Sequence, residues 1–213
     1  MNVYCISGLG ADKRAFNSLV LKHELKHLEW IDPFPTESIE SYAKRLSITI
    51  DQDQPFVLIG LSFGRMVAVE IAKITAPICT IQISSVDHHD QLPKLYRFIG
   101  KTGLIRLLPR LCFNIPTPIA SFAFQTKNKK LLSAIIKDAE VEFTKWAVNA
   151  ILNWKNEQKL EQLIQIGGEK DLILPSNKNM NHIIKGGGHF MIVDKADELS
   201  AILNQELAKF EIL

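Results

Sequence analysis

The chain has 213 residues, of which 46% are hydrophobic and 23% charged, and a formal net charge of +2 at neutral pH. This length and composition suit one globular domain over residues 1–213 with a full hydrophobic core. The nearly balanced charge argues against nucleic acid and against an anionic membrane surface as partners.

The first apolar segment begins at residue 2, and no basic stretch followed by a long apolar run is present there. We therefore expect no secretory signal. No apolar stretch of the sequence approaches the roughly 20 residues needed to span a bilayer. Three cysteines, Cys5, Cys79 and Cys112, show no paired spacing. An odd, unpaired set favours buried, reduced thiols, so we expect a soluble protein of the cytoplasm.

Short apolar segments bounded by turn residues recur along the chain and predict strands. They cover residues 2–6, 27–31, 56–61, 78–83, 162–166 and 181–185. Strands that are apolar throughout and separated by helices are typical of a parallel sheet covered on both faces. The sequence therefore predicts an α/β fold with a mostly parallel sheet of about six strands and helices on both faces.

Three other segments carry apolar residues at helical spacing. The last of them, Asp197 to Phe210, is expected to close the final edge of the sheet. The residues that share a face in the three segments are Phe16, Leu19, Val20 and His23; Ile39, Tyr42, Ala43, Leu46 and Ile50; and Leu199, Ile202, Leu203 and Leu207.

A Gly-x-Ser-x-Gly pattern, Gly60 to Gly64, separates the third predicted strand from a helix-forming run. A strand that leads into such a turn holds the serine rigidly and exposes its Oγ, and the helix behind it directs free N–H groups at developing negative charge. Ser62 is therefore a candidate nucleophile. The alternative is a serine that only caps the helix.

Two candidate partners follow later strands. Asp171 comes after the fifth predicted strand and a glycine turn, and His189 comes after the sixth strand and three glycines. An aspartate in a turn can instead bond its own backbone, and a loop histidine can bond nearby carbonyls. These alternatives stay open for each residue taken singly.

The order serine, acid, histidine, with each residue at a strand-to-loop boundary, resembles the α/β-hydrolase superfamily over nearly the whole chain. The resemblance implies that Ser62, His189 and Asp171 form a catalytic triad. Asp87 is a rival for the acid, because it follows the fourth predicted strand, where some superfamily members place it. About six strands instead of the usual eight imply a minimal form of the fold.

The loop after the first strand would supply half of an oxyanion hole. By the resemblance, the donors are the backbone N–H groups of Leu9 and Phe63. Two residues depart from the pattern. Ser7 replaces the histidine that usually braces this loop, and Arg65 stands where glycine is common. We expect Arg65 either to reach solvent or to pair with a carboxylate such as Glu70.

By the same resemblance, residues about 87–157 form a helical cap inserted after the fourth strand. Apolar residues recur there at helical spacing, and basic residues occupy the other faces: Lys94, Arg97, Lys101, Arg106 and Arg110. One interpretation is a cap packed on the core with a solvated basic surface. The other is a pocket roof from which a cation meets an acidic substrate.

Two other patterns suggest ligands only weakly. Adjacent residues such as those of Asp87-His88-His89-Asp90 rarely point at one ion, and no further ligand cluster stands out. A polar entrance to the cap, where a histidine contacts substrate, is the alternative. The run Gly186 to Gly188 lacks the lysine spacing of a phosphate-binding loop, so it is interpreted as the hinge that aims His189. We expect no cofactor and no metal.

The resemblance implies a serine hydrolase that cleaves a carboxylic ester or thioester of a small molecule through an acyl-enzyme intermediate. An acyltransferase or a carbon–carbon bond hydrolase would use the same triad. A catalytically inert scaffold that binds a ligand or a protein is favoured by Ser7 and Arg65 and opposed by the intact Ser62, His189 and Asp171 set. The sequence leaves the oligomeric state open.

Overall fold

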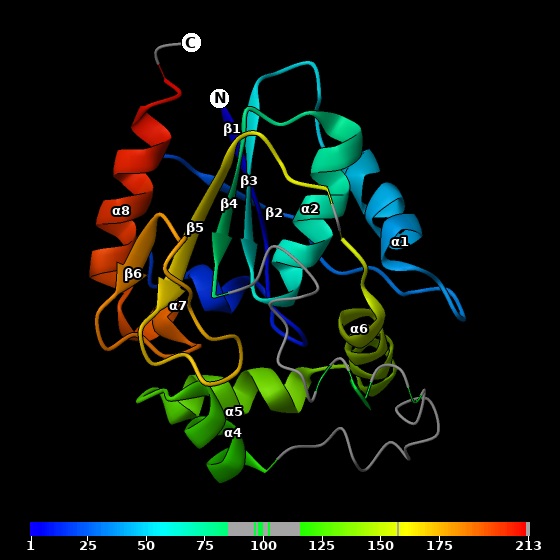
Figure 1. Cartoon of the computed structure of the whole chain (residues 1–213), viewed down its shortest axis with the longest axis vertical. Coiled ribbons are helices and arrows are strands. Elements are labelled where there is room, and N and C mark those ends of the chain that lie inside the picture. Colours follow the sequence, from blue (N-terminus) through cyan, green and yellow to red (C-terminus); the bar gives the residue numbers. More distant parts are fainter. Residues whose placement is uncertain (85–95, 97, 100–101, 103–115, 157, 212–213) are drawn as a thin grey trace.

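A computed structural model describes residues 1–84, 96, 98–99, 102, 116–156 and 158–211. Within these residues the strands form one parallel sheet in the order β2-β1-β3-β4-β5-β6 (Figure 1). The predicted six-stranded parallel sheet is confirmed. Its strands are β1 (Asn2–Ile6), β2 (Leu25–His27), β3 (Phe56–Leu61), β4 (Cys79–Ile83), β5 (Leu163–Gly168) and β6 (His182–Ile184).

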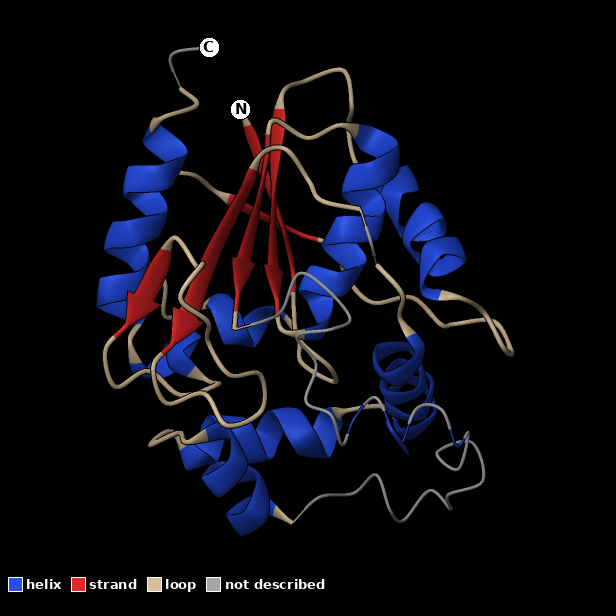
Figure 2. Ribbon diagram, in the orientation of Figure 1, coloured by secondary structure: helices blue, strands red, loops and turns tan. Residues whose placement is uncertain are grey.

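Helices cover both faces of the sheet, as expected. On one face, α1 (Ile39–Leu46) and α2 (Phe63–Thr75) pack on alternate strand residues such as Tyr4 and Leu58. The other face holds the short α7 (Met191–Asp194) and α8 (Ala196–Ala208), whose apolar side packs on strand residues of the opposite register, such as Val57. Figure 2 shows these two layers on either side of the strands.

The segment that precedes β2, residues 16–23, differs from the expectation. The predicted helical face of residues 16–23 is wrong, because only a 3₁₀ helix, η1 (Lys13–Phe16), forms and Val20 is 73% exposed. Side chains of α8 hold this segment instead: Ser200 Oγ accepts from Val20 N, and Asn204 Oδ1 accepts from Lys22 N, each at 2.9 Å. These hydrogen bonds occupy backbone groups that a helix would use internally.

The second strand was predicted over residues 27–31, but in the structure it is β2, Leu25–His27, which begins two residues earlier and ends four residues earlier. Its residues pair with Val3, Tyr4 and Cys5, and Leu28 N makes the last hydrogen bond to Cys5 O at 2.9 Å. The chain then leaves the edge, and Trp30 enters a cluster of aromatic rings. Tertiary packing of that ring therefore ends the strand.

Between β4 and β5, the helices with described bounds lie at the carboxyl ends of the strands: α4 (Thr117–Phe124), α5 (Lys129–Asp138) and α6 (Val141–Asn153) (Figure 1). In α6, Phe143 and Trp146 pack against the rings of Trp30, Tyr42 and Phe63, with centroids 4.4 to 6.4 Å apart. Much of the earlier part of the expected insertion falls outside the described residues.

None of the helices in the described ranges combines the length and the apolar character that crossing a bilayer requires.

Candidate active site

Ser62 lies at the sharp turn between β3 and α2. Its backbone has φ 50° and ψ −116°, which an L-residue adopts only when its surroundings impose it, and its N–H donates to Ile83 O at 2.9 Å. Both glycines of the motif are required sterically. A Cβ at Gly60 would lie 2.3 Å from Arg65 Cα, and one at Gly64 would lie 2.1 Å from Ser7 O. The strand and helix can therefore pass this closely only with glycine at both positions.

The structure brings Ser62, His189 and Asp171 into one chain of hydrogen bonds. Ser62 Oγ lies 2.9 Å from His189 Nε2, and His189 Nδ1 lies 2.8 Å from Asp171 Oδ2. His189 and Asp171 are only 3% and 4% exposed, so water does not compete for these contacts. Because a carboxylate only accepts hydrogen bonds, Nδ1 carries the proton and Nε2 is left to accept the serine hydroxyl proton.

Backbone groups hold the aspartate and the histidine in place. Asp171 Oδ1 accepts hydrogen bonds from the N–H groups of Ile173 and Leu174, both at 2.9 Å. The glycine run before His189 folds against the same loop, where Gly187 O accepts from Lys170 N at 2.8 Å. The two loops at the ends of β5 and β6 are thereby joined, and the geometry of the acid and the imidazole is preorganised.

The loop after β1 lies beside the serine. A Cβ at Gly8 would be 3.4 Å from Ser62 Cβ, and Gly10 has a φ of +64° that completes a tight turn. Ala11 O accepts from Ser7 Oγ at 2.6 Å and from Trp30 Nε1 at 2.9 Å. The buried Ser7 hydroxyl therefore braces the loop in this chain.

Leu9 and Phe63, the two residues expected to donate backbone N–H groups, both line the cavity that contains Ser62. Phe63 is the first residue of α2, so its N–H has no acceptor within the helix. Both residues thus line the same cavity as Ser62.

This candidate active-site cavity has a volume of about 150 Å³ and is almost entirely apolar among the described residues. Its polar side chains among these residues are Ser62, His189 and Tyr96. The pKa of the Tyr96 hydroxyl is raised, mainly by burial and also by the charge of Asp171. The apolar lining comprises Leu9, Ala11, Leu61, Phe63, Met66, Phe124, Leu132, Ile135, Ile136, Ile151, Ile173, Leu174 and Phe190.

Sequence reasoning missed Tyr96 and Phe124 as residues of the site. Phe124 packs the edge of its ring against the His189 imidazole at 5.2 Å, and its carbonyl accepts from Phe190 N at 3.2 Å. The helical spacing of Leu132, Ile135 and Ile136 marked a buried face but did not show what that face covers. No local signal in the sequence separates a cavity lining from an ordinary core face.

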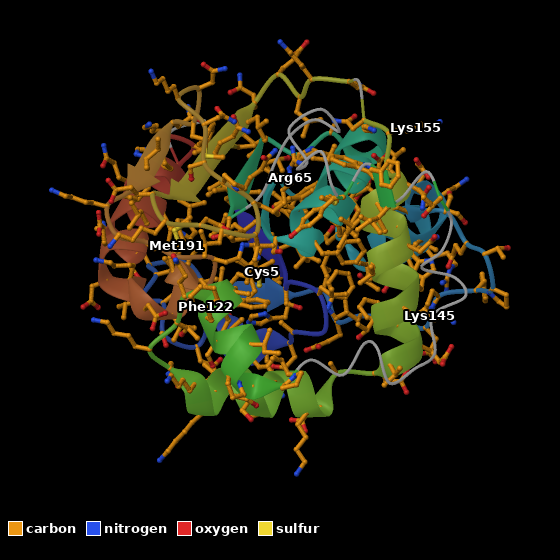
Figure 3. The ribbon with its side chains drawn as sticks, turned by 60° about the horizontal axis from the view of Figure 1, so that its bottom comes forward. Cys5, Arg65, Phe122, Lys145, Lys155 and Met191 are labelled. Atoms are coloured by element: carbon orange, nitrogen blue, oxygen red, sulfur yellow. The ribbon has the colours of Figure 1, made fainter. Side chains whose placement is uncertain are left out.

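Of the two expectations for Arg65, the one that it reaches solvent is wrong, because its side chain is fully buried (Figure 3). The guanidinium carbon lies 5.2 Å from the centre of the Trp154 ring, a cation–π distance. Glu70 Oε1 accepts from Lys73 Nζ at 2.7 Å and from Trp154 Nε1 at 2.8 Å. The aromatic face of Trp154 thus covers the cation behind Ser62.

Cys5 and Cys79 are buried and form no disulfide, and burial raises the pKa of the Cys79 thiol to about 12. Their placement in the sheet interior makes them core residues. In the part of the chain that the structure describes, no cluster of His, Cys, Asp or Glu is arranged to bind a metal ion.

Several residues singled out in the sequence lie outside the described residues. They are the rival acid Asp87, its neighbours His88, His89 and Asp90, the basic residues Lys94, Arg97, Lys101, Arg106 and Arg110, and Cys112.

No protein-family model matches the sequence, and no curated protein matches it. Solved structures do resemble it. A thermophilic esterase from Thermogutta terrifontis is 15% identical, with a TM-score of 0.70, over 98% of this chain and 90% of that one. MenH from S. aureus is 15% identical, with a TM-score of 0.72, over 98% and 94%. RedJ, a thioesterase from the prodiginine pathway of Streptomyces coelicolor, is 14% identical, with a TM-score of 0.68, over 97% and 90%. The fold is that of the α/β-hydrolases.

Proposed function

We propose that the protein is a serine hydrolase that cleaves a carboxylic ester or thioester of a small molecule. The observation that carries this proposal is the buried chain of hydrogen bonds from Ser62 Oγ through His189 to Asp171, which opens into an apolar cavity. An esterase and a thioesterase among the structures of similar fold support the same reaction class.

In the proposed reaction, Ser62 Oγ attacks the carbonyl carbon while His189 Nε2 takes the hydroxyl proton. Asp171 holds the imidazole tautomer and stabilises the imidazolium that forms. The N–H groups of Leu9 and Phe63 donate to the tetrahedral oxyanion, each lowering the barrier by about 3 kcal/mol.

Collapse of the intermediate breaks the bond from the carbonyl carbon to the leaving oxygen or sulfur, which takes the proton from His189 Nε2. Water then attacks the acyl group on Ser62 with His189 again as base. A second collapse frees the carboxylic acid and returns the proton to Ser62 Oγ. The complete cycle needs no metal or cofactor.

We also propose that α4, α5 and α6 belong to a cap, inserted over about residues 87–157 in a single domain of residues 1–213. Support comes from their place over the carboxyl ends of the strands (Figure 2) and from Phe124, Leu132 and Ile151, one residue of each helix, in the cavity lining.

The test is hydrolysis of para-nitrophenyl butanoate and of a butanoyl thioester by the wild type, Ser62→Ala and Ser47→Ala. Ser47 is a buried serine of a short 3₁₀ helix whose hydroxyl donates to Lys44 O, so it controls for loss of a hydroxyl. We expect turnover and an initial burst of nitrophenol from the wild type and Ser47→Ala only. Equal turnover by folded Ser62→Ala would overturn the proposal.

A further inference from the structure

A second cavity of about 180 Å³ adjoins the active-site cavity. Four side chains line both spaces, so the two cavities are neighbours with one shared wall: Leu9, Phe124, Ile135 and Ile136. The other described residues that line the second cavity are Gly10, Ala120, Lys137, Ala139, Val141 and Thr144.

The shared wall is apolar and begins at the catalytic residues. Phe124 contacts the His189 ring, and Leu9 follows Gly8, which lies against Ser62. Ile135 and Ile136 come from α5, so the wall joins the loop after β1 to two different helices. The described side chains that separate a group at Ser62 from the second cavity are therefore all hydrocarbon.

Among the residues that the structure describes, the polar side chains of the second cavity are Lys137 and Thr144. Lys137 is exposed, so its ammonium lies at the outer boundary, and Thr144 Oγ1 donates to Glu140 O at 2.7 Å. What remains is a lining suited to an alkyl chain. Each methylene moved there from water is worth about 0.8 kcal/mol, or about a fourfold gain in kcat/KM.

We propose that the acyl group of the substrate is a straight alkyl chain longer than the active-site cavity alone holds. Its tail passes between Leu9, Phe124 and α5 into the second cavity. The acyl side is the one assigned there, because the leaving group must depart before water enters, whereas the acyl chain stays bound to Ser62. This inference rests on the proposed ester or thioester hydrolysis.

Val141 offers a way to fill the second cavity without touching the first. It is the first residue of α6, lines only the second cavity and is 37% exposed, so a larger side chain there is accommodated. In Val141→Trp the indole would occupy the space proposed for the tail. Glu142→Trp, at the exposed neighbouring position, is the matched control because Glu142 lines neither cavity.

The experiment measures kcat/KM for para-nitrophenyl dodecanoate and butanoate with the wild type and both variants, together with the thermal midpoint of each protein. We expect Val141→Trp to lower the value for dodecanoate by about tenfold or more, as if two methylenes stayed in water. The kcat/KM of Val141→Trp for butanoate should stay within about twofold of the wild type. So should the kcat/KM of Glu142→Trp for each of the two esters.

Ile136→Ala gives a second measurement that does not depend on a larger side chain. Because the smaller side chain leaves more space in the shared wall, the ratio of kcat/KM for dodecanoate to kcat/KM for butanoate should rise. Unchanged ratios in both Val141→Trp and Ile136→Ala, with Ser62-dependent turnover of butanoate, would overturn this inference alone. A response only to the length of the alcohol chain, in alkyl butanoates, would also overturn it. Absence of Ser62-dependent turnover of every ester would overturn the proposed function instead.

Discussion

The two walls of the active-site cavity are held in different ways. One wall, called the sheet-edge wall, consists of the loops at the carboxyl ends of the strands that carry Ser62, His189, Asp171 and Leu9. Hydrogen bonds and close backbone contacts at glycines hold it in place. The helical wall consists of Phe124, Leu132, Ile135 and Ile136, which contribute only apolar surface. Under the proposed function, the first wall positions the reacting atoms and the second sets the shape of what binds.

The largest expected effect separates the two walls by their kinetics. His189→Ala removes the proposed base and should lower kcat for a short ester on the order of 10⁶-fold. Phe124→Leu, beside it in the helical wall, keeps an apolar side chain and should change mainly KM, by less than about tenfold. Steady-state kinetics on para-nitrophenyl butanoate measure both. A kcat loss in Phe124→Leu as large as that in His189→Ala would break the division.

Gly10 lies where the two walls meet. Its φ is +64°, and a Cβ there would lie 2.8 Å from Ala139 Cβ, at the junction of α5 and α6. Gly10→Ala should lower the free energy of unfolding by about 3 kcal/mol, from the left-handed backbone and the overpacked contact together.

Gly186→Ala is its control. Gly186 has a φ of +67° but nothing within 4 Å of a Cβ, so only the backbone cost of about 1–2 kcal/mol applies. Urea denaturation compares the two. Equal losses would show that the Ala139 contact does not couple the helical wall to the loop after β1.

The anchoring of α6 should depend on pH through Glu37. Trp146 Nε1 of α6 donates to Glu37 O at 2.9 Å, and the Glu37 carboxylate, 2% exposed, binds Arg45 at 2.7 Å. Burial raises the pKa of Glu37, but hydrogen bonds from Arg45, Phe34 N and Ser41 outweigh it, so the pKa lies below its ordinary value of 4.5.

A carboxyl with a lowered pKa in the folded state stabilises the protein above the ordinary pKa, and that stability is lost as the pH falls through the folded-state value. Glu37→Gln should therefore be less stable than the wild type by about 2 kcal/mol at neutral pH and nearly equal to it in acid. Unfolding free energies from pH 7 downward measure this, and parallel curves would contradict it.

The smallest expected effect is in the sheet-edge wall. Ser7→Ala removes one of the two hydrogen bonds to Ala11 O and leaves that from Trp30. The loss of unfolding free energy should be about 1 kcal/mol, with kcat reduced severalfold because the Leu9 N–H is less well held. If kcat is unchanged, Ser7 does not position the oxyanion donor.

The same contrast explains what the sequence could predict. The strand, turn and helix around Ser62 form a local pattern, and the glycines after the last two strands mark the loops of Asp171 and His189. For the helical wall the sequence predicted only the helical spacing of apolar residues, because what an apolar face packs against is decided by tertiary structure. Likewise, the bonds from Ser200 and Asn204 that keep residues 17–22 out of a helix come from the other end of the chain. The cover that Trp154 gives Arg65 is equally distant in sequence.

The most direct test of an activated serine at the sheet edge is labelling with a fluorophosphonate probe, followed by peptide mass mapping, in the wild type, Ser62→Ala and His189→Ala. The phosphonate should attach to Ser62 of the wild type and to neither folded variant, because the reaction needs both the Oγ nucleophile and the imidazole that takes its proton. An unlabelled but folded wild type, or a label that persists in Ser62→Ala, would contradict the assignment of Ser62 as the nucleophile.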